Sequence, residues 1–239
     1  MERIDKLLCS TGRWSRREVK DLVRQGRVAA DGRTVLRPEE KADPETVRLT
    51  VDGAEVVCAP FVYVMLHKPA GVLSATEDRS QPTVLDLLPP ELKRRGLFPV
   101  GRLDKDTTGL LLLTDDGPLA HGLLSPRKHV DKVYLARVDG RVDGADAAAL
   151  AAGLTLGDGT VCLPAGLEPL GDGSACLVTL REGKYHQVKR MLAARGKPVV
   201  SLHRLQMGPL ALDEDLKPGE WRYLSNLERA ELLGAGQLQ

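Results

Sequence analysis

The chain lacks the patterns that mark a membrane span or a metal site. No apolar run approaches the roughly 18 residues that a membrane span needs, and no secretory signal opens the sequence. The four cysteines, Cys9, Cys58, Cys162 and Cys176, form no C-x-x-C pair and have no histidine pair at ligand spacing nearby. We therefore expect a cytoplasmic protein without a membrane partner, with reduced cysteines and no metal site.

Phosphate-binding glycine motifs, internal repeats and low-complexity tracts are also absent. We therefore expect no bound cofactor. With 239 residues and 42% hydrophobic content, the chain can bury one sizeable core and still form a small second domain. The composition between Thr50 and Pro60 shifts to small and apolar residues that end in a proline, which is typical of a linker. We predict one domain over residues 1–59 and a second over residues 60–239.

A formal net charge of +1 hides an uneven distribution of charge. Residues 1–37 carry ten Lys or Arg against five Asp or Glu, and residues 38–59 carry two against six. Ser15 and Glu18 predict the capping box of a helix that buries Val19, Leu22 and Val23. Most of its basic residues share the opposite side, which is either an ordinary solvated face or a surface for nucleic-acid phosphates. The residues predicted to contact RNA here are Arg16, Arg17, Lys20 and Arg24.

The densest polar motif of the chain is Gly101–Gly117, which reads G-R-L-D-K-D-T-T-G-L-L-L-L-T-D-D-G. It predicts a polar loop, a buried strand and a closing turn. A loop held by a rigid strand is a suitable place for chemistry. A structural alternative is that Asp104 or Asp106 caps backbone N–H groups while Arg102 pairs with a carboxylate.

This motif resembles the G-R-L-D-x-x-T-x-G-L-L-L-L-T-x-D-G signature of the pseudouridine synthases that modify ribosomal RNA. The first 50 residues, with R-x-D-K-x-L, S-R-R and G-x-V-x-x-D-G, resemble the S4 RNA-binding domain. The resemblance implies an α+β fold, in which a small S4-like domain precedes a catalytic domain with a mixed, largely antiparallel sheet flanked by helices. It also implies that Asp104 is the catalytic nucleophile.

The resemblance implies roles for further residues. Tyr134, in K-x-Y-L, would lie against the target base, and Lys189, in K-Y-H-Q-V-K-R-M, would face Asp104. Arg102 would fill the gap that a displaced base leaves. His67 departs from the family's usual L-N-K-P-x-G corner, and we predict that it is a structural substitute. The remaining predicted RNA contacts are Arg127, Lys128, His186 and Arg190.

Residue patterns predict several further elements. Strands are expected at Phe61–Leu66, Thr155–Val161 and Ala175–Leu180, a helical turn at Gln81–Leu88 and a basic loop at Lys93–Gly96. A helix over Glu182–Gly196 would bury Tyr185, Val188, Met191 and Leu192, and would carry His186, Lys189 and Arg190 on its other side.

We interpret the sequence as a monomeric synthase that converts a uridine of 16S ribosomal RNA to pseudouridine, because K-Y-H-Q-V-K-R-M is more similar to the small-subunit enzymes. The alternatives are a 23S ribosomal RNA synthase, a noncatalytic S4-type ribosome-binding factor, and a hydrolase of glycosidic bonds. A hydrolase would need a second carboxylate, for which Asp106 is the neighbour in sequence.

Overall fold

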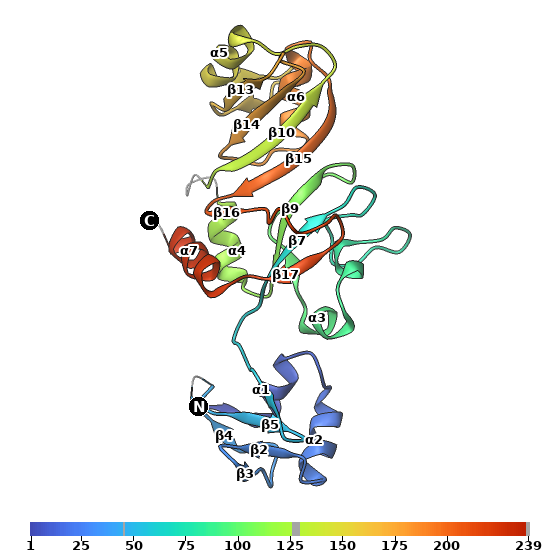
Figure 1. The fold of residues 1–239 in the computed structure, drawn as a ribbon, viewed down its shortest axis with the longest axis vertical. Helices are drawn as coiled ribbons and strands as arrows, with labels where there is room; N and C mark the ends of the chain where they lie inside the picture. The colour runs from blue at the N-terminus through green and yellow to red at the C-terminus, as the bar shows by residue number, and fades with distance from the viewer. Residues whose placement is uncertain (45, 126–129, 238–239) are drawn as a thin grey trace. The chain divides into compact units, whose positions relative to one another are not determined.

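The computed structural model describes residues 1–44, 46–125 and 130–237, and these form two compact units (Figure 1). The N-terminal unit comprises Met1–Val62 and Leu88–Leu97, and the sheet unit comprises Tyr63–Leu87 and Phe98–Gln239. The N-terminal unit is therefore built from two separate stretches of sequence, and the domain boundary after residue 59 stays a prediction.

The N-terminal unit packs helices against short antiparallel strands. The predicted capping box is confirmed, because Ser15 and Glu18 exchange hydrogen bonds at the start of α2, and Val19, Leu22 and Val23 are buried beneath it. Strand β1 pairs with β4, and a second sheet has the order β3-β2-β5-β6. The elements are β1 (Glu2–Arg3), α1 (Ile4–Ser10), α2 (Arg16–Arg24), β2 (Val28–Ala30), β3 (Arg33–Thr34), β4 (Lys41–Ala42), β5 (Leu49–Val51), β6 (Ala54–Val56) and α3 (Pro90–Arg95).

Helix α3 occupies the stretch for which a basic loop was predicted, and that prediction was wrong. Pro90 stands in its first turn, and Gly96 ends it in the left-handed conformation. Arg94 donates to the Gly12 carbonyl at 2.7 Å, and Arg95 donates to the Ala59 carbonyl at 2.7 Å. These two cations hold the N-terminal unit together, so the second stretch of the unit is bound to the first.

The sheet unit contains a nine-stranded mixed sheet in its described residues, which confirms the predicted fold class. Its strand order is β13-β14-β10-β15-β9-β7-β17, with β16 beside β15 and β8 beside β9; β15 and β9 are parallel, and the other pairs are antiparallel. The strands are β7 (Tyr63–Lys68), β8 (Phe98–Pro99), β9 (Thr108–Thr114), β10 (Lys132–Val138), β13 (Gly166–Leu170), β14 (Ala175–Leu180), β15 (Val199–Met207), β16 (Leu210–Ala211) and β17 (Trp221–Tyr223). The helices are η1 (Val84–Leu87), α4 (Gly117–Leu124), α5 (Gly144–Ala152), α6 (Gln187–Ala194) and α7 (Asn226–Gln237).

Two sequence expectations differ from the structure in this unit. Thr155–Val161 is not one strand, because Gly157 and Gly159 break it into a hairpin of β11 (Leu154–Thr155) and β12 (Val161–Cys162). Helix α6 begins at Gln187 rather than at Glu182, so Tyr185 lies before it and is exposed. The strand at Ala175–Leu180 and the helical turn at Val84–Leu87 are confirmed.

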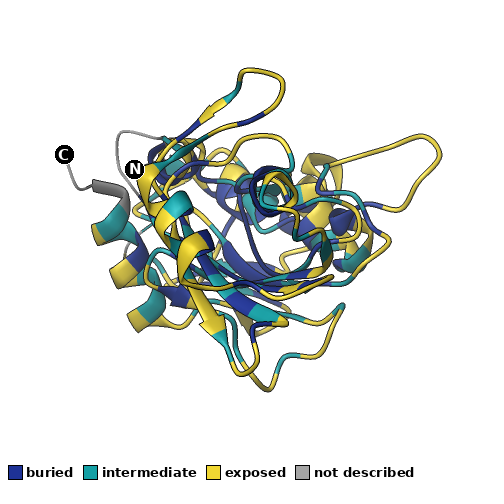
Figure 2. Cartoon of the chain, turned by 90° about the horizontal axis from the view of Figure 1, so that it is seen from above, coloured by how far each residue is buried: buried dark blue, intermediate teal, exposed yellow. Residues whose placement is uncertain are grey.

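The two faces of the sheet are covered differently. Tyr63, Met65, Leu110 and Leu112 pack with α4 and α7, which lie side by side in Figure 1. Because side chains alternate along a strand, Lys68 and Gly109 belong to the opposite face. Figure 2 shows the buried strands running through the interior, with exposed residues on the outer sides of the helices.

One row of residues crosses four adjacent strands on this opposite face. Tyr134 pairs with Arg204, Arg204 with Gly109, and Gly109 with Lys68. Directly paired residues share a face of the sheet. The row lies where the Gly101–Thr107 loop enters β9, so the strands align Tyr134 and Lys68 with the end of that loop.

Gly109 allows β9 and β15 to approach each other closely. Its φ is +105°, and a Cβ atom added there would lie 2.2 Å from the Arg204 carbonyl oxygen. The glycine of the T-x-G-L motif is therefore required by backbone packing as well as by its dihedral angle.

We expect Gly109→Ala to lower the free energy of unfolding by more than about 3 kcal/mol, because it adds a backbone clash to the dihedral strain. Gly196→Ala is the matched control, since Gly196 has a φ of +71° but open space around its Cβ position. It should cost only about 1 kcal/mol. Urea denaturation of both variants measures this, and equal losses would show that close packing is not the constraint.

Candidate active site

Hydrogen bonds fix the backbone of the loop that carries Asp104 before and after that residue. The buried Ser74 hydroxyl donates to the Leu103 carbonyl at 2.9 Å and accepts from the Leu103 N–H at 3.0 Å. Beyond Asp104, the Gly71 N–H donates to the Lys105 carbonyl at 2.8 Å. The backbone on either side of Asp104 is therefore fixed before any substrate binds.

Lys68 is the main anchor of this loop, and sequence reasoning did not identify it. Its ammonium lies 3.0 Å from the Pro69 carbonyl oxygen, 3.1 Å from that of Asp104, 3.3 Å from that of Lys105 and 2.9 Å from that of Thr107. The residue is 0% exposed. Burial lowers the pKa of Lys68 to about 8, although the carboxylates of Asp106 and Asp104 act in the opposite direction. The signals in the sequence were a lysine that ends an apolar strand and its place at the K of the L-N-K-P-x-G corner.

Asp104 and Asp106 share one cation. Lys189 Nζ lies 3.0 Å from Asp104 Oδ2 and 2.6 Å from Asp106 Oδ1. The side chain of Asp104 is 25% exposed, whereas that of Asp106 is 75% exposed. Burial lowers the pKa of Lys189, but its hydrogen bonds to Asp106 and Asp104 outweigh burial and raise it, so Lys189 stays protonated. The hydrogen bond from Lys189 lowers the pKa of Asp106.

The start of α6 faces Asp104. His186 is the N-cap of α6 and has a φ of +49° and a ψ of +34°, and its Nε2 lies 3.4 Å from Asp104 Oδ1. His186 and Lys189, from the start of α6, therefore contact different oxygens of the same carboxylate. His186 was predicted to contact RNA, which stays a prediction, and the structure places its ring against Asp104.

Tyr134 lies in β10 and is 9% exposed. In the row of paired residues it shares a sheet face with Lys68, whose ammonium reaches the Asp104 loop. At about 4.8 Å between neighbouring strands, Tyr134 is two strands away from Gly109, or roughly 10 Å along the row. The register therefore puts Tyr134 in the same cross-strand row as Lys68, and its contact with the target base stays a prediction.

The residues predicted to contact RNA differ in whether their charges are paired within the protein. Arg102 is exposed and has no ion pair within the described part of the chain. Arg190 is committed internally, because it donates to Asp158 at 2.5 Å and to the Tyr185 carbonyl at 3.3 Å. These contacts link the β11–β12 hairpin to α6, and the RNA contact of Arg190 stays a prediction. Arg127 and Lys128 lie outside the described residues.

Helix α2 also carries both unpaired and paired cations. Arg16, Arg17 and Lys20 are exposed, and none of them forms an ion pair among residues 1–44, 46–125 and 130–237. Arg24, in contrast, pairs with Asp21 at 2.5 Å. The unpaired basic surface of α2 is therefore smaller than the sequence predicted, and we call these three unpaired residues the α2 cations.

His67 has the structural surroundings that were predicted for it. Its Nδ1 lies 2.7 Å from the Leu216 carbonyl oxygen, which can only accept, so Nδ1 carries a proton. Its ring also packs edge-on against that of His203, with the centroids 5.3 Å apart.

In the described residues, no group of three or more His, Cys, Asp or Glu side chains could hold a metal ion, and no helix is long and apolar enough to cross a membrane.

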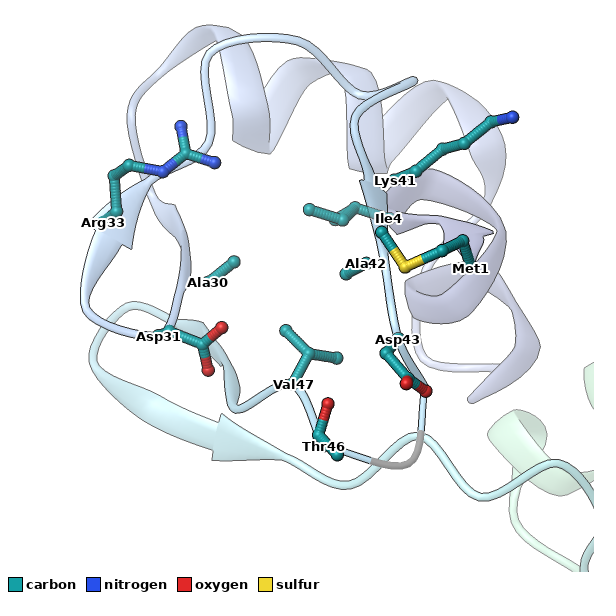
Figure 3. Close-up of a pocket in the computed structure, with 10 residues that line it drawn as sticks. All are labelled: Met1, Ile4, Ala30, Asp31, Arg33, Lys41, Ala42, Asp43, Thr46 and Val47. Carbon is teal, nitrogen blue, oxygen red and sulfur yellow. The ribbon is translucent and has the colours of Figure 1, made fainter.

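A shallow hollow in the N-terminal unit contains none of the predicted site residues (Figure 3). Ile4, Ala30 and Val47 lie between Asp31 on one side and Asp43 on the other. The remaining lining residues are Met1, Arg33, Lys41, Ala42 and Thr46. The side-chain charges of Asp31 and Asp43 offset those of Arg33 and Lys41.

Comparisons with known proteins identify the family of this chain. A family model described as RNA pseudouridylate synthase matches residues 62–194, and the S4 domain model matches residues 2–47. An uncharacterized RNA pseudouridine synthase of Bacillus subtilis is 48% identical and covers 95% of this chain and 96% of its own length. Ribosomal small subunit pseudouridine synthase A of Pseudomonas aeruginosa is 43% identical, with 93% and 96% covered. The protein of that name from Vibrio cholerae is 40% identical, with 96% and 99% covered.

A solved structure agrees with these matches. The crystal structure of a pseudouridylate synthase aligns with a TM-score of 0.68 at 36% identity, and covers 97% of this chain and 100% of that one. The similarity therefore extends over both structural units.

We expect one lysine to titrate with a pKa near 8 in NMR spectra of the folded chain, and to be missing in Lys68→Met. The folded pKa lies below the ordinary value of 10.5, so above pH 8 the folded chain has lost a proton that the unfolded chain still binds. The free energy of unfolding should therefore rise between about pH 8 and 10.5, by at most about 1.4 kcal/mol per pH unit.

Lys105→Met is the control for this titration. Lys105 lies in the same loop, but it is exposed and donates to the Gln81 side chain. The signal near pH 8 should remain in this variant. If all lysines of the wild-type chain titrated near 10.5, Lys68 would not be confined in the way the structure indicates.

Proposed function

The chain belongs to the RNA pseudouridylate synthase family and carries an S4 domain, as its motifs predicted, and on this basis we propose that it isomerises one uridine of 16S ribosomal RNA with Asp104 as the nucleophile. The target RNA is inferred from the relatives named ribosomal small subunit pseudouridine synthase A. The observation that carries the mechanism is the Asp104 carboxylate, which is fixed at its backbone by Lys68 and paired at its side chain with Lys189.

The reaction needs no external group. The N1–C1′ bond of the uridine breaks, the uracil turns, and a new bond joins C5 to C1′. The proton on C5 is lost and N1 gains one, so the product is an isomer of the substrate. One carboxylate can form a covalent intermediate and leave again, which makes a cofactor unnecessary.

Lys189 supports the charge of Asp104 during this step. A base that enters the site excludes water, and burial disfavours a free carboxylate. The Lys189 ammonium at 3.0 Å offsets that cost. Its raised pKa keeps the ammonium charged, so the support persists at neutral and alkaline pH.

The target base must leave its stack to reach Asp104. Tyr134 provides a buried ring on the same face of the sheet, suited to stack on the displaced uracil. Arg102 is two residues before Asp104, exposed and unpaired within the described chain, so its side chain is free to enter the gap in the RNA. Both roles are proposals that follow from the family resemblance and from these positions.

Hydrolysis by a carboxylate pair is less well supported. A general acid needs a raised pKa, but the hydrogen bond from Lys189 lowers that of Asp106. Asp106 is also largely exposed. A noncatalytic ribosome-binding factor would have no need for a carboxylate whose backbone and side chain are both fixed, so isomerisation accounts better for the geometry.

We expect cells that lack this protein to lose one pseudouridine from 16S ribosomal RNA and to regain it with the wild-type gene but not with Asp104→Asn. The substitution keeps the side-chain size and removes the nucleophile, so the single-turnover rate should fall more than about 1,000-fold, or ~4 kcal/mol of barrier. RNA affinity should change by less than about threefold.

Asp106→Asn is the matched control, because it removes a carboxylate bound to the same lysine. We expect it to restore the modification, with a rate within about tenfold of wild type. If Asp106 proved essential and Asp104 dispensable, the assignment of the nucleophile would be wrong. A pseudouridine lost from 23S rather than 16S ribosomal RNA would redirect the proposal to the large subunit.

For the S4 domain, we propose that the α2 cations contact RNA phosphates. Replacing Arg16, Arg17 and Lys20 together with Ala should weaken RNA binding and reduce the slope of log affinity against log salt by about two, because each neutralised phosphate releases counterions. Equilibrium binding between low and moderate salt measures this slope.

The control replaces three paired cations of the same unit with Ala. Arg24, Arg27 and Arg33 are bound to Asp21, Asp52 and Glu40, respectively. This variant loses the same charge but should change the slope less. Equal changes in both variants would mean that overall charge, rather than the free face of α2, governs binding. Point substitutions suit this test better than removal of residues 1–59, because that removal would delete the carbonyl groups to which Arg94 and Arg95 of α3 donate.

A further inference from the structure

Tyr185 presents an aromatic ring to solvent beside Asp104. It is 75% exposed, the most exposed of all the Phe, Tyr and Trp side chains of the chain. Its ring stacks on that of His186, with the centroids 3.8 Å apart and the planes 18° from parallel. His186 Nε2 in turn lies 3.4 Å from Asp104 Oδ1. The Tyr185 ring is therefore connected to the proposed nucleophile through a single intervening ring, that of His186.

The turn that carries Tyr185 is fixed by buried polar groups. Gln187 donates to Glu182 at 2.5 Å and accepts from the Lys184 N–H at 3.0 Å. Glu182 also accepts from the Leu163 N–H at 2.8 Å, and both Glu182 and Gln187 are buried. Arg190 holds the Tyr185 carbonyl from the other side. The exposed ring thus stands on a rigid support.

The backbone at this turn is also unusual. Among the described residues, only Asp31, Asp52 and His186 combine a positive φ with a side chain. Asp tolerates this conformation through local hydrogen bonds, whereas His186 makes no capping hydrogen bond. Such a conformation costs of order 1–3 kcal/mol and occurs preferentially at functional sites. At this turn, the conformation directs the His186 ring towards Asp104 and places the Tyr185 ring against the His186 ring.

An exposed stacked ring at this position suits an RNA base. When the target uridine leaves its stack, the bases on either side lose a stacking partner. Proteins that bind single-stranded nucleic acid replace such contacts with aromatic side chains, which accept any base because every base has a π face. Tyr134 is too buried to reach a neighbouring nucleotide, whereas Tyr185 is open to one.

We propose that Tyr185 is a stacking platform for the base adjacent to the target uridine, and that the Tyr185–His186 stack thereby sets the position of the RNA relative to Asp104. The inference rests on the proposed function. It concerns how the substrate is held, so it can fail while the isomerase activity stands.

The test uses a short RNA that spans the uridine mapped in cells. Wild-type protein, Tyr185→Phe and Tyr185→Ala are each measured for affinity and single-turnover rate. Tyr185→Ala should weaken binding about 5- to 150-fold, from the usual strength of base–aromatic stacking, and Tyr185→Phe should resemble wild type. Because the side chain is exposed, thermal unfolding should be unchanged in both.

A matched set of RNAs separates stacking from a purely structural role. Each RNA carries an abasic nucleotide immediately before or after the target uridine. One of them should bind wild-type protein as weakly as Tyr185→Ala binds the intact RNA, and combining the two changes should cause no further loss. This non-additivity would not arise if Tyr185 only supported His186.

Three outcomes would overturn the inference. They are unchanged affinity of Tyr185→Ala, full wild-type affinity for both abasic RNAs, and additive losses from the protein and RNA changes. The abasic RNAs on wild-type protein need no variant, so the inference can be tested even if Tyr185→Ala were to misfold. If the wild-type protein binds this RNA without converting its uridine, the proposed function fails instead, and the binding measurements still decide the role of Tyr185.

Discussion

The candidate site depends on a charge that is buried beneath it. The Lys68 ammonium is surrounded by backbone carbonyl oxygens, three of them from the Asp104 loop. An ammonium without a carboxylate partner is costly to bury, so these dipoles must remain in place as long as the lysine is charged. The loop therefore has little freedom to relax away from Lys68, and the carboxylate above it is held in position for reaction.

Much of the fold could be predicted from the sequence, because its signals were local. The capping box at Ser15, the leucine-rich β9 and the alternation along β10 each follow from a few neighbouring residues. The errors arose where distant residues decide the structure. Tyr185 fits the apolar spacing of a helix, but a turn forms there instead, in which Gln187 binds a Glu182 side chain that also accepts from the Leu163 N–H, 19 residues earlier. The basic stretch before the motif became α3 because carbonyl groups some 80 residues away accept from its Arg94.

The candidate site shows the same limit. The motif around Asp104 indicated the carboxylate, K-Y-H-Q-V-K-R-M suggested Lys189, and the structure brings these two together. Neither pattern could indicate Lys68, since burial of a lysine depends on strands that pair across the sheet. Nor can counts of basic residues separate free cations from paired ones: Arg16 and Arg24 are equivalent in the sequence, yet only Arg24 has a carboxylate partner. The charge pattern predicted where basic residues lie on the surface, but not which of them are free of a carboxylate partner.

The division of the N-terminal unit has a consequence for biosynthesis. This unit needs α3, which follows the first strand of the sheet unit in the chain. During translation, residues 1–62 can form their own core, but the contacts of Arg94 and Arg95 must wait until Leu97 has emerged from the ribosome. By then β7 has already been made, and it must remain unpaired until β9 follows. The nascent chain therefore passes through a stage in which an apolar strand is exposed beside an incomplete RNA-binding unit, and this stage is where chaperones would be expected to act.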